Sequence, residues 1–178
     1  LLIAMPDVQD PHFNQSVVFM CQHSNEGGLG FVINHALTMR LEELMEQMKV
    51  EIEDESIAQL PIFLGGPMQQ DRGFILHTPA EIQWETTVNI SDDVCLTTSQ
   101  DILNAIAQGK GPEKFLIALG YSAWNEGQLE AEIKRNAWIS TDNSEHILFD
   151  TPISEKWKKA AKNMGLDIRL LNTEVAHA

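Results

Sequence analysis

Two apolar runs without polar alternation constrain the fold of this 178-residue chain most strongly. Val17–Cys21 and Phe115–Leu119 are continuous apolar segments, which is typical of strands covered on both faces of a sheet. Short apolar runs bounded by turn residues predict strands at residues 16–23, 29–34, 61–65, 73–78, 86–90, 115–120, 137–140 and 146–149. Because these strands come in runs and do not alternate strictly with helices, the sequence predicts an α+β fold with a mixed, coiled β-sheet.

About four flanking helices are expected from apolar spacing and from residues that favour helix ends. One face of the first helix is predicted to comprise Leu37, Leu41, Leu44, Met45 and Met48. The ends of the other three are marked by Thr98 with Asp101 and Gly109, by Asn125 or Gly127, and by Thr151 with Pro152 and Gly165. No repeat or linker interrupts the pattern, so one domain over residues 1–178 is predicted, with residues 36–60 as an acidic helical annex.

The charge of the chain is strongly acidic and unevenly distributed. The net charge is −14, and residues 1–109 hold 16 acidic and 3 basic side chains, against 10 and 9 in residues 110–178. Lys and Arg supply most of the affinity of DNA-binding proteins, and anionic membrane surfaces attract the same residues. We therefore expect neither direct DNA binding nor membrane binding. The acidic surface serves either solubility alone or docking of a basic protein partner.

Compartment and cofactors follow from what the sequence lacks. No apolar run approaches the roughly 20 residues of a membrane-spanning helix. Two cysteines, Cys21 and Cys95, make no disulfide framework, which favours a reducing cytoplasm. The sequence contains no phosphate-binding loop, nucleophile elbow or HExxH metal motif. We predict no cofactor, metal ion or catalytic residue.

A few residues could still carry chemistry if the fold brought them together. Cys21 and His23 are two positions apart in a predicted strand and would share a face. With His35, His77 or Cys95 they could form a zinc site or a Cys–His pair, although a packed thiol is the favoured interpretation. Gly65-Gly66-Pro67 is interpreted as a tight turn in preference to an anion-binding nest.

The stretch from Gly120 to Trp138 is the best candidate for a site. We predict a candidate pocket formed by His77, Trp124, Gln128 and Glu130. The alternative is that Trp124 and Trp138 fill the core, which is the commoner place for large aromatic side chains. Trp138, in a predicted strand, is expected to be structural. Trp124, in a predicted loop, is expected to be the more exposed of the two.

This stretch carries a family resemblance together with two other motifs, Leu1-Leu2-Ile3-Ala4-Met5-Pro6 and Gly65-Gly66-Pro67. The chain resembles the YqgE/AlgH family of small bacterial proteins. The similarity extends through Asp10-Pro11, Gly30, Asn34, Asp71-Arg72-Gly73, His77 and the last helix around Trp157. Ser122-Ala123 stands where Ala-Gly is typical of the family. The resemblance implies no activity and no role for any residue.

Three functions are therefore ranked. The first is a non-catalytic regulatory or adaptor protein that acts through a protein partner. The second is a small-molecule-binding protein or enzyme with a pocket near Trp124, Gln128 and His77. The third is a transcriptional regulator, suggested by the family name alone. The basic last helix, with Lys156, Lys158, Lys159 and Lys162, is expected to form a solvated face.

Overall fold

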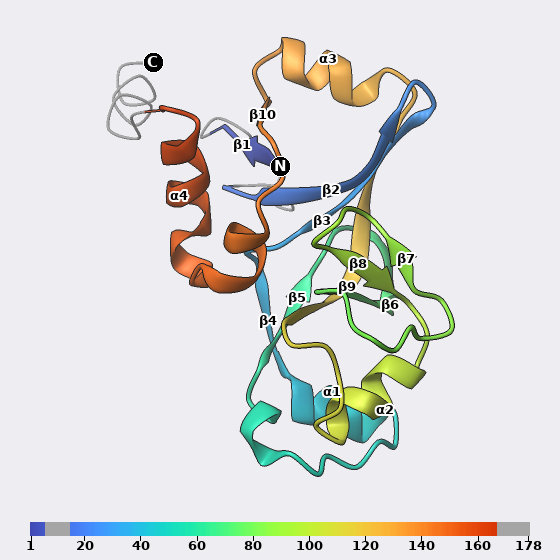
Figure 1. Cartoon of the computed structure of the whole chain (residues 1–178). Coiled ribbons are helices and arrows are strands. Elements are labelled where there is room, and N and C mark those ends of the chain that lie inside the picture. The colour runs from blue at the N-terminus through green and yellow to red at the C-terminus, as the bar shows by residue number, and fades with distance from the viewer. Residues whose placement is uncertain (6–14, 167–178) are drawn as a thin grey trace.

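One long strand, β9 (Phe115–Asn125), connects the two halves of the molecule. In the computed structural model, which describes residues 1–5 and 15–166, the first half of β9 pairs with β5 (Pro61–Leu64) and β6 (Met68–His77). Its second half pairs with β3 (Gly27–Val32). Figure 1 shows β9 running from the lower part of the molecule to the upper part. Of the residues that carry the family resemblance, Pro6, Asp10 and Pro11 lie outside the described residues.

The strands form a ten-stranded curled sheet in the order β10-β1-β2-β3-β9-β6-β8-β7, with β4 and β5 beside this path. The remaining strands are β1 (Leu2–Ala4), β2 (Val17–Ser24), β4 (Ala36–Arg40), β7 (Val88–Asn89), β8 (Cys95–Thr97) and β10 (Trp138–Ser140). All of these pairs are antiparallel except β5 with β9, which is parallel. The α+β prediction with a mixed, coiled sheet is confirmed. The Asn25-Glu26 turn joins β2 and β3 as a hairpin.

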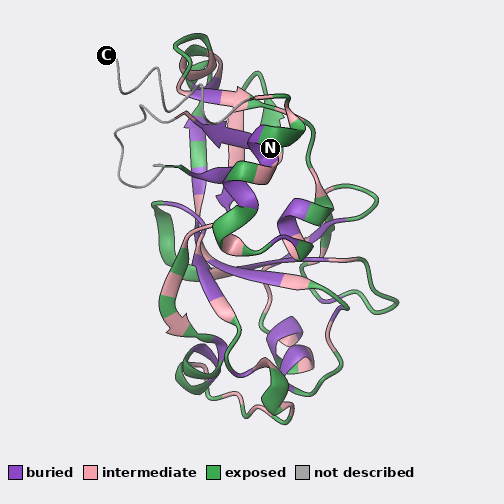
Figure 2. Cartoon of the chain, turned by 90° about the vertical axis from the view of Figure 1, so that its left-hand side faces the viewer, coloured by how far each residue is buried: buried purple, intermediate pink, exposed green. Residues whose placement is uncertain are grey.

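Short helices cover both halves of the sheet. They are α1 (Leu41–Gln47), α2 (Asp101–Ala107), α3 (Gln128–Lys134) and α4 (Lys156–Asn163), with 3-10 turns η1 (Glu55–Ile57) and η3 (Ile153–Glu155) and a π-helical turn η2 (His146–Asp150). In Figure 1, α1 and α2 lie under the lower half, α3 lies at the top, and α4 lies beside the upper strands. Figure 2 shows buried residues along the strands, and exposed residues on loops and outer helix faces.

Three apolar clusters fill the interior. The largest joins the sheet to η2 and α4 and contains Phe19, Phe31 and Trp157. A second joins α1 and α2 to the lower strands, and a third lies under α3 and contains Trp124 and Trp138. The annex proposed for residues 36–60 comprises β4, α1 and η1, and α1 packs into the second cluster through Leu41, Leu44 and Met45.

Several predicted boundaries are wrong for identifiable reasons. Residues 146–149 form the turn η2 in place of the predicted strand, and the apolar Ile147 and Leu148 of this turn are buried without pairing to the sheet. Leu37 lies in β4 and not in the first helix, because residues 36–40 pair with β5. The run at 86–90 shortens to β7 at Val88–Asn89.

The predicted helix starts fail in two places because the capping residues bond elsewhere. The Thr98 hydroxyl, the group that would cap the helix, bonds to Thr86 Oγ1 at 3.1 Å, and α2 begins only at Asp101. The Thr151 hydroxyl donates to the carbonyl of His146 at 3.0 Å and so closes η2, while α4 begins at Lys156. The third helix follows Gly127, one of its two alternative starts.

The Gly65-Gly66-Pro67 turn lies where β3 and β9 separate. The carbonyl of Gly65 accepts from the backbone of Val32 at 2.8 Å and from the hydroxyl of Ser122 at 3.0 Å. A Cβ atom on Gly66 would lie 2.3 Å from the backbone of Tyr121. The backbone of the turn thus packs directly against the backbone of β9, and this contact leaves no room for a side chain at Gly66.

Candidate functional site

A stretch rich in carboxylates, residues 42–55, lies on α1 and the segment that follows it. Leu41, Leu44 and Met45 are buried on one side of α1, so its glutamates face outward. The backbone N–H groups of Leu41 and Glu42 donate to the carbonyls of Leu60 and Ala58, which holds the return segment beside the helix. These two hydrogen bonds place residues 58–60 next to the start of α1.

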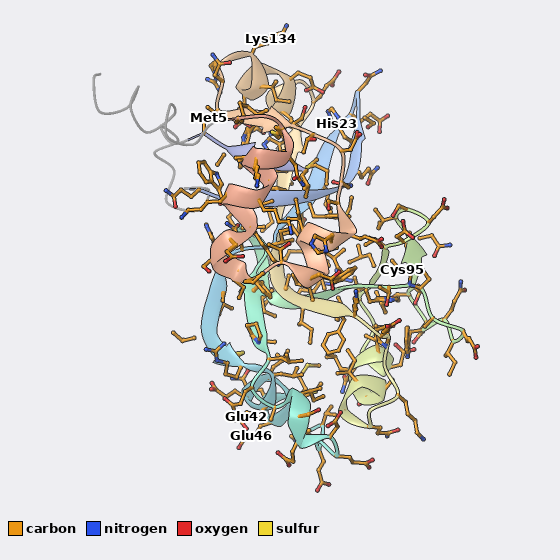
Figure 3. The ribbon with its side chains drawn as sticks, turned by 60° about the vertical axis from the view of Figure 1, so that its left-hand side comes forward. Met5, His23, Glu42, Glu46, Cys95 and Lys134 are labelled. Atoms are coloured by element: carbon orange, nitrogen blue, oxygen red, sulfur yellow. The ribbon has the colours of Figure 1, made fainter. Side chains whose placement is uncertain are left out.

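A groove of about 330 Å³ lies between α1 and the segment that follows it, and we call it the acidic groove. Its residues are Glu42, Glu46, Val50, Glu51, Ile52, Glu55 and Ala58. Four glutamates and three apolar residues therefore line the groove. Figure 3 shows Glu42 and Glu46 next to each other at the lower end of the molecule.

The carboxylates of the acidic groove form no ion pairs with the described residues of the chain. Residues 42–55 contain seven carboxylates and one basic residue, Lys49. Within residues 1–5 and 15–166, the ion pairs are His23–Glu130, Lys114–Asp150 and His146–Asp150, and none involves the groove glutamates. Hydrogen bonds from Ser56 hold the pKa of the neighbouring Asp54 carboxyl below its ordinary value and keep the 3-10 turn η1 in place. Such a groove suits a side chain with an aliphatic stem and a cationic end.

His77, the first of the predicted site residues, is a buried structural histidine. It is 1% exposed, its Nε2 lies 2.7 Å from Thr97 Oγ1, and its Nδ1 lies 2.8 Å from the carbonyl oxygen of Thr78. Its ring packs edge-on against Trp84. Burial lowers the pKa of the imidazole, the Thr78 carbonyl opposes that change, and both ring nitrogens already have partners.

The other three predicted residues lie together, far from His77. Glu130 accepts from His23 at 2.7 Å, and the Gln128 side chain accepts from the backbone N–H of Asn125 at 3.0 Å. The partner of His77 on β9 is Phe115, and Trp124 is nine positions further along that strand. At about 3.3 Å per residue this is about 30 Å along β9. The structure thus gathers Trp124, Gln128 and Glu130 and places His77 elsewhere.

The prediction that Trp124 lies in a loop is wrong, and Trp124 exceeds Trp138 in exposed fraction by too little to distinguish the two residues. β9 continues through Asn125, so Trp124 lies in a strand and is 4% exposed, against 3% for Trp138. The two indoles pack edge-on with ring centroids 5.9 Å apart. Both tryptophans belong to the core of the third apolar cluster, as the structural alternative anticipated.

Cys21 and His23 are not brought together with the other residues proposed for a zinc site or a Cys–His pair. A register shift between Met20 and Gln22 interrupts the strand alternation that would align Cys21 with His23. Burial raises the pKa of the Cys21 thiol to about 12, and the Cys95 thiol donates to Asn89. Figure 3 shows His23 and Cys95 in different parts of the molecule. In the described part of the chain, no three His, Cys, Asp or Glu residues are grouped to hold a metal ion.

Sequence reasoning missed two features of the molecule. The first is the acidic groove: Val50 and Ile52 alternate with acidic residues, and this pattern could have indicated apolar side chains beside the carboxylates. The prediction that Lys156 shares a solvated face with the other lysines of the last helix is wrong, since it is 3% exposed. Its spacing from Ile153 and Ala160 matches the apolar face of a helix, which was the available signal.

Comparisons with known proteins agree with this architecture. A family model described as AlgH-like matches residues 1–169. A UPF0301 protein of Nitrosococcus oceani is 46% identical over 99% of this chain and 94% of its own length. Another, of Methylococcus capsulatus, is 43% identical over 99% of this chain and 93% of its own.

Solved structures show the same fold. The solution structure of AlgH from Pseudomonas aeruginosa has a TM-score of 0.80 and 42% identity, covering 96% of this chain and 90% of that one. A crystal structure of a Corynebacterium diphtheriae protein has a TM-score of 0.68 at 15% identity, covering 91% and 84%, and shares the fold. The resemblance seen in the sequence is confirmed, and the chain belongs to the AlgH-like family.

Proposed function

We propose that this protein is a non-catalytic adaptor or regulatory protein of the cytoplasm that binds a basic segment of a partner protein. The observation that carries the proposal is the acidic groove, with four glutamates around the apolar residues Val50, Ile52 and Ala58. These carboxylates have no basic partner among residues 1–5 and 15–166, so their charge is available to another molecule.

The chemistry of the groove defines the partner. Lys and Arg side chains bury an aliphatic stem while keeping the charged end near water. An amphipathic basic segment would place stems on Val50 and Ile52 and cationic ends on the surrounding glutamates. The excess of acidic side chains in residues 1–109 adds long-range attraction. This attraction speeds the encounter with a basic partner and weakens with salt.

Charge-matched variants test this proposal. The groove variant replaces Glu42, Glu46, Glu51 and Glu55 with Gln. The control variant makes the same replacement at Glu26, Glu81, Glu113 and Glu126, which are also exposed, and changes the net charge equally. Exposed ion pairs contribute ~0.2–1 kcal/mol each, so the groove variant should bind an amphipathic Lys/Leu peptide about fourfold or more weakly than wild type.

Calorimetric titration measures this difference, and a Glu/Leu peptide serves as the negative control. Capture from native lysate with the wild type and both variants then identifies partners that only the groove variant loses. Equal peptide binding by the groove and control variants would show that global charge alone attracts the peptide, and would refute docking in the groove.

A further inference from the structure

A second pocket, separate from the acidic groove, contains a buried cation. It has a volume of about 350 Å³ and lies between the start of β9, β5 and the η2–α4 segment. Apolar side chains, among them Phe63, Phe115, Phe149 and Ile153, dominate its lining, and Lys156 is its one charged residue. We call it the Lys156 pocket.

The ammonium group of Lys156 has no counter-charge within the described residues. Its Nζ donates to the carbonyls of Ile33 at 2.8 Å and Leu148 at 3.0 Å, and lies 5.0 Å from the centre of the Phe63 ring. An ammonium group carries three N–H donors, so one remains after these two bonds. In the part of the chain that the structure describes, no carboxylate forms an ion pair with Lys156. Burying such a charge is costly unless an anion compensates it.

The walls of the Lys156 pocket are held in place independently of any ligand. Lys114 and Asp150 form an ion pair of 2.8 Å that ties the start of β9 to the end of η2. At the next residue, the Thr151 hydroxyl donates to the carbonyl of His146 and closes η2. Leu60 is 38% exposed, so an apolar surface continues from the pocket toward solvent. A preformed apolar pocket with one fixed polar group is the usual form of a small-molecule site.

We propose that the Lys156 pocket binds a small amphipathic carboxylate, such as a medium-chain or aromatic acid. The carboxylate accepts the remaining N–H of Lys156 and supplies the missing negative charge. The apolar body packs against Phe63, Phe115 and Ile153. Burial holds the pKa of Lys156 at about 8, so the side chain is mainly protonated at neutral pH and able to bind an anion.

Octanoate and octan-1-ol are the probes that separate charge recognition from apolar binding. Wild-type protein should bind octanoate about tenfold or more tightly than octan-1-ol, because a hydrogen bond between two charged groups adds to the apolar contact. Lys156→Met should reduce octanoate affinity by a similar factor. Lys158→Met, which removes an exposed lysine from the same helix, should leave it unchanged.

Nuclear magnetic resonance of the labelled wild-type protein gives a test that needs no variant. Octanoate should shift the side-chain signals of Phe63, Phe115, Phe149 and Lys156 with one saturating affinity. Failure of octanoate to bind, equal affinity for octan-1-ol, or shifts confined to another surface would each overturn the proposal. These outcomes are independent of the acidic groove, whose glutamates do not line this pocket.

Discussion

At the scale of single residues, Lys156 links burial to pH. Burial lowers the pKa of its ammonium group from 10.5 to about 8 in the folded protein. Between these two values the unfolded chain binds more protons than the folded one, so the free energy of unfolding rises with pH. The difference between the two pKa values corresponds to roughly 3 kcal/mol at full effect.

The wild type should therefore gain stability relative to Lys156→Met as the pH rises from about 8 to 10.5. Denaturant unfolding of both proteins at several pH values measures this difference, and groups common to both proteins cancel. Lys158→Met, at an exposed position, should keep a constant difference from wild type. A constant difference for Lys156→Met as well would show that the ammonium group is not desolvated as its position indicates.

At the scale of elements, the junction between β9 and the Gly65-Gly66-Pro67 turn should be the most sensitive backbone contact. Gly120 has φ +76°, and a Cβ atom there would lie 2.6 Å from the carbonyl oxygen of Gly66. Gly127 has nearly the same φ, +74°, and a Cβ atom there would meet no other atom within 4 Å. Replacing either glycine by alanine therefore carries a similar conformational cost, and the two positions differ in the space available for a Cβ atom.

Gly127→Ala should cost about 1–2 kcal/mol, the penalty of a left-handed conformation for a residue with a Cβ atom. Gly120→Ala should cost clearly more, since the backbone of the Gly65-Gly66-Pro67 turn must also move. Chemical denaturation midpoints at fixed conditions compare the two. Equal losses would mean that the turn and β9 separate without penalty.

At the scale of the whole molecule, charge decides which macromolecules can approach. The net charge of −14 and the acidic groove oppose contact with phosphate backbones, and we expect no binding to generic duplex DNA at physiological salt. The lysines of α4 do not form a continuous basic surface, because Lys156 is buried. A gel-shift titration tests this, and salt-sensitive binding near ~10⁻⁶ M would contradict it. Among residues 1–5 and 15–166, no helix is long and apolar enough to span a membrane.

The sequence by itself determined the features that depend on local pattern. Apolar runs such as Val17–Cys21 and Phe115–Leu119 predicted strands, and their grouping predicted the α+β class, because burial on a sheet requires these patterns locally. The charge imbalance of residues 1–109 is also visible without a structure. The alternation of Val50 and Ile52 with acidic residues indicated the apolar part of the acidic groove, although we did not predict it.

Only the tertiary structure decided which distant residues meet. Trp124 is buried because β9 extends beyond the apolar segment Phe115–Leu119 as far as Asn125. The indole of Trp124 then packs on Trp138. His77 lies apart from Trp124 because strand register fixes positions along β9 that no local pattern encodes. The ammonium group of the buried Lys156 has hydrogen-bond partners because two backbone carbonyls, 123 and 8 residues away in the chain, accept its N–H groups. Partners of this kind are set by the folded arrangement, and sequence spacing carries no record of them.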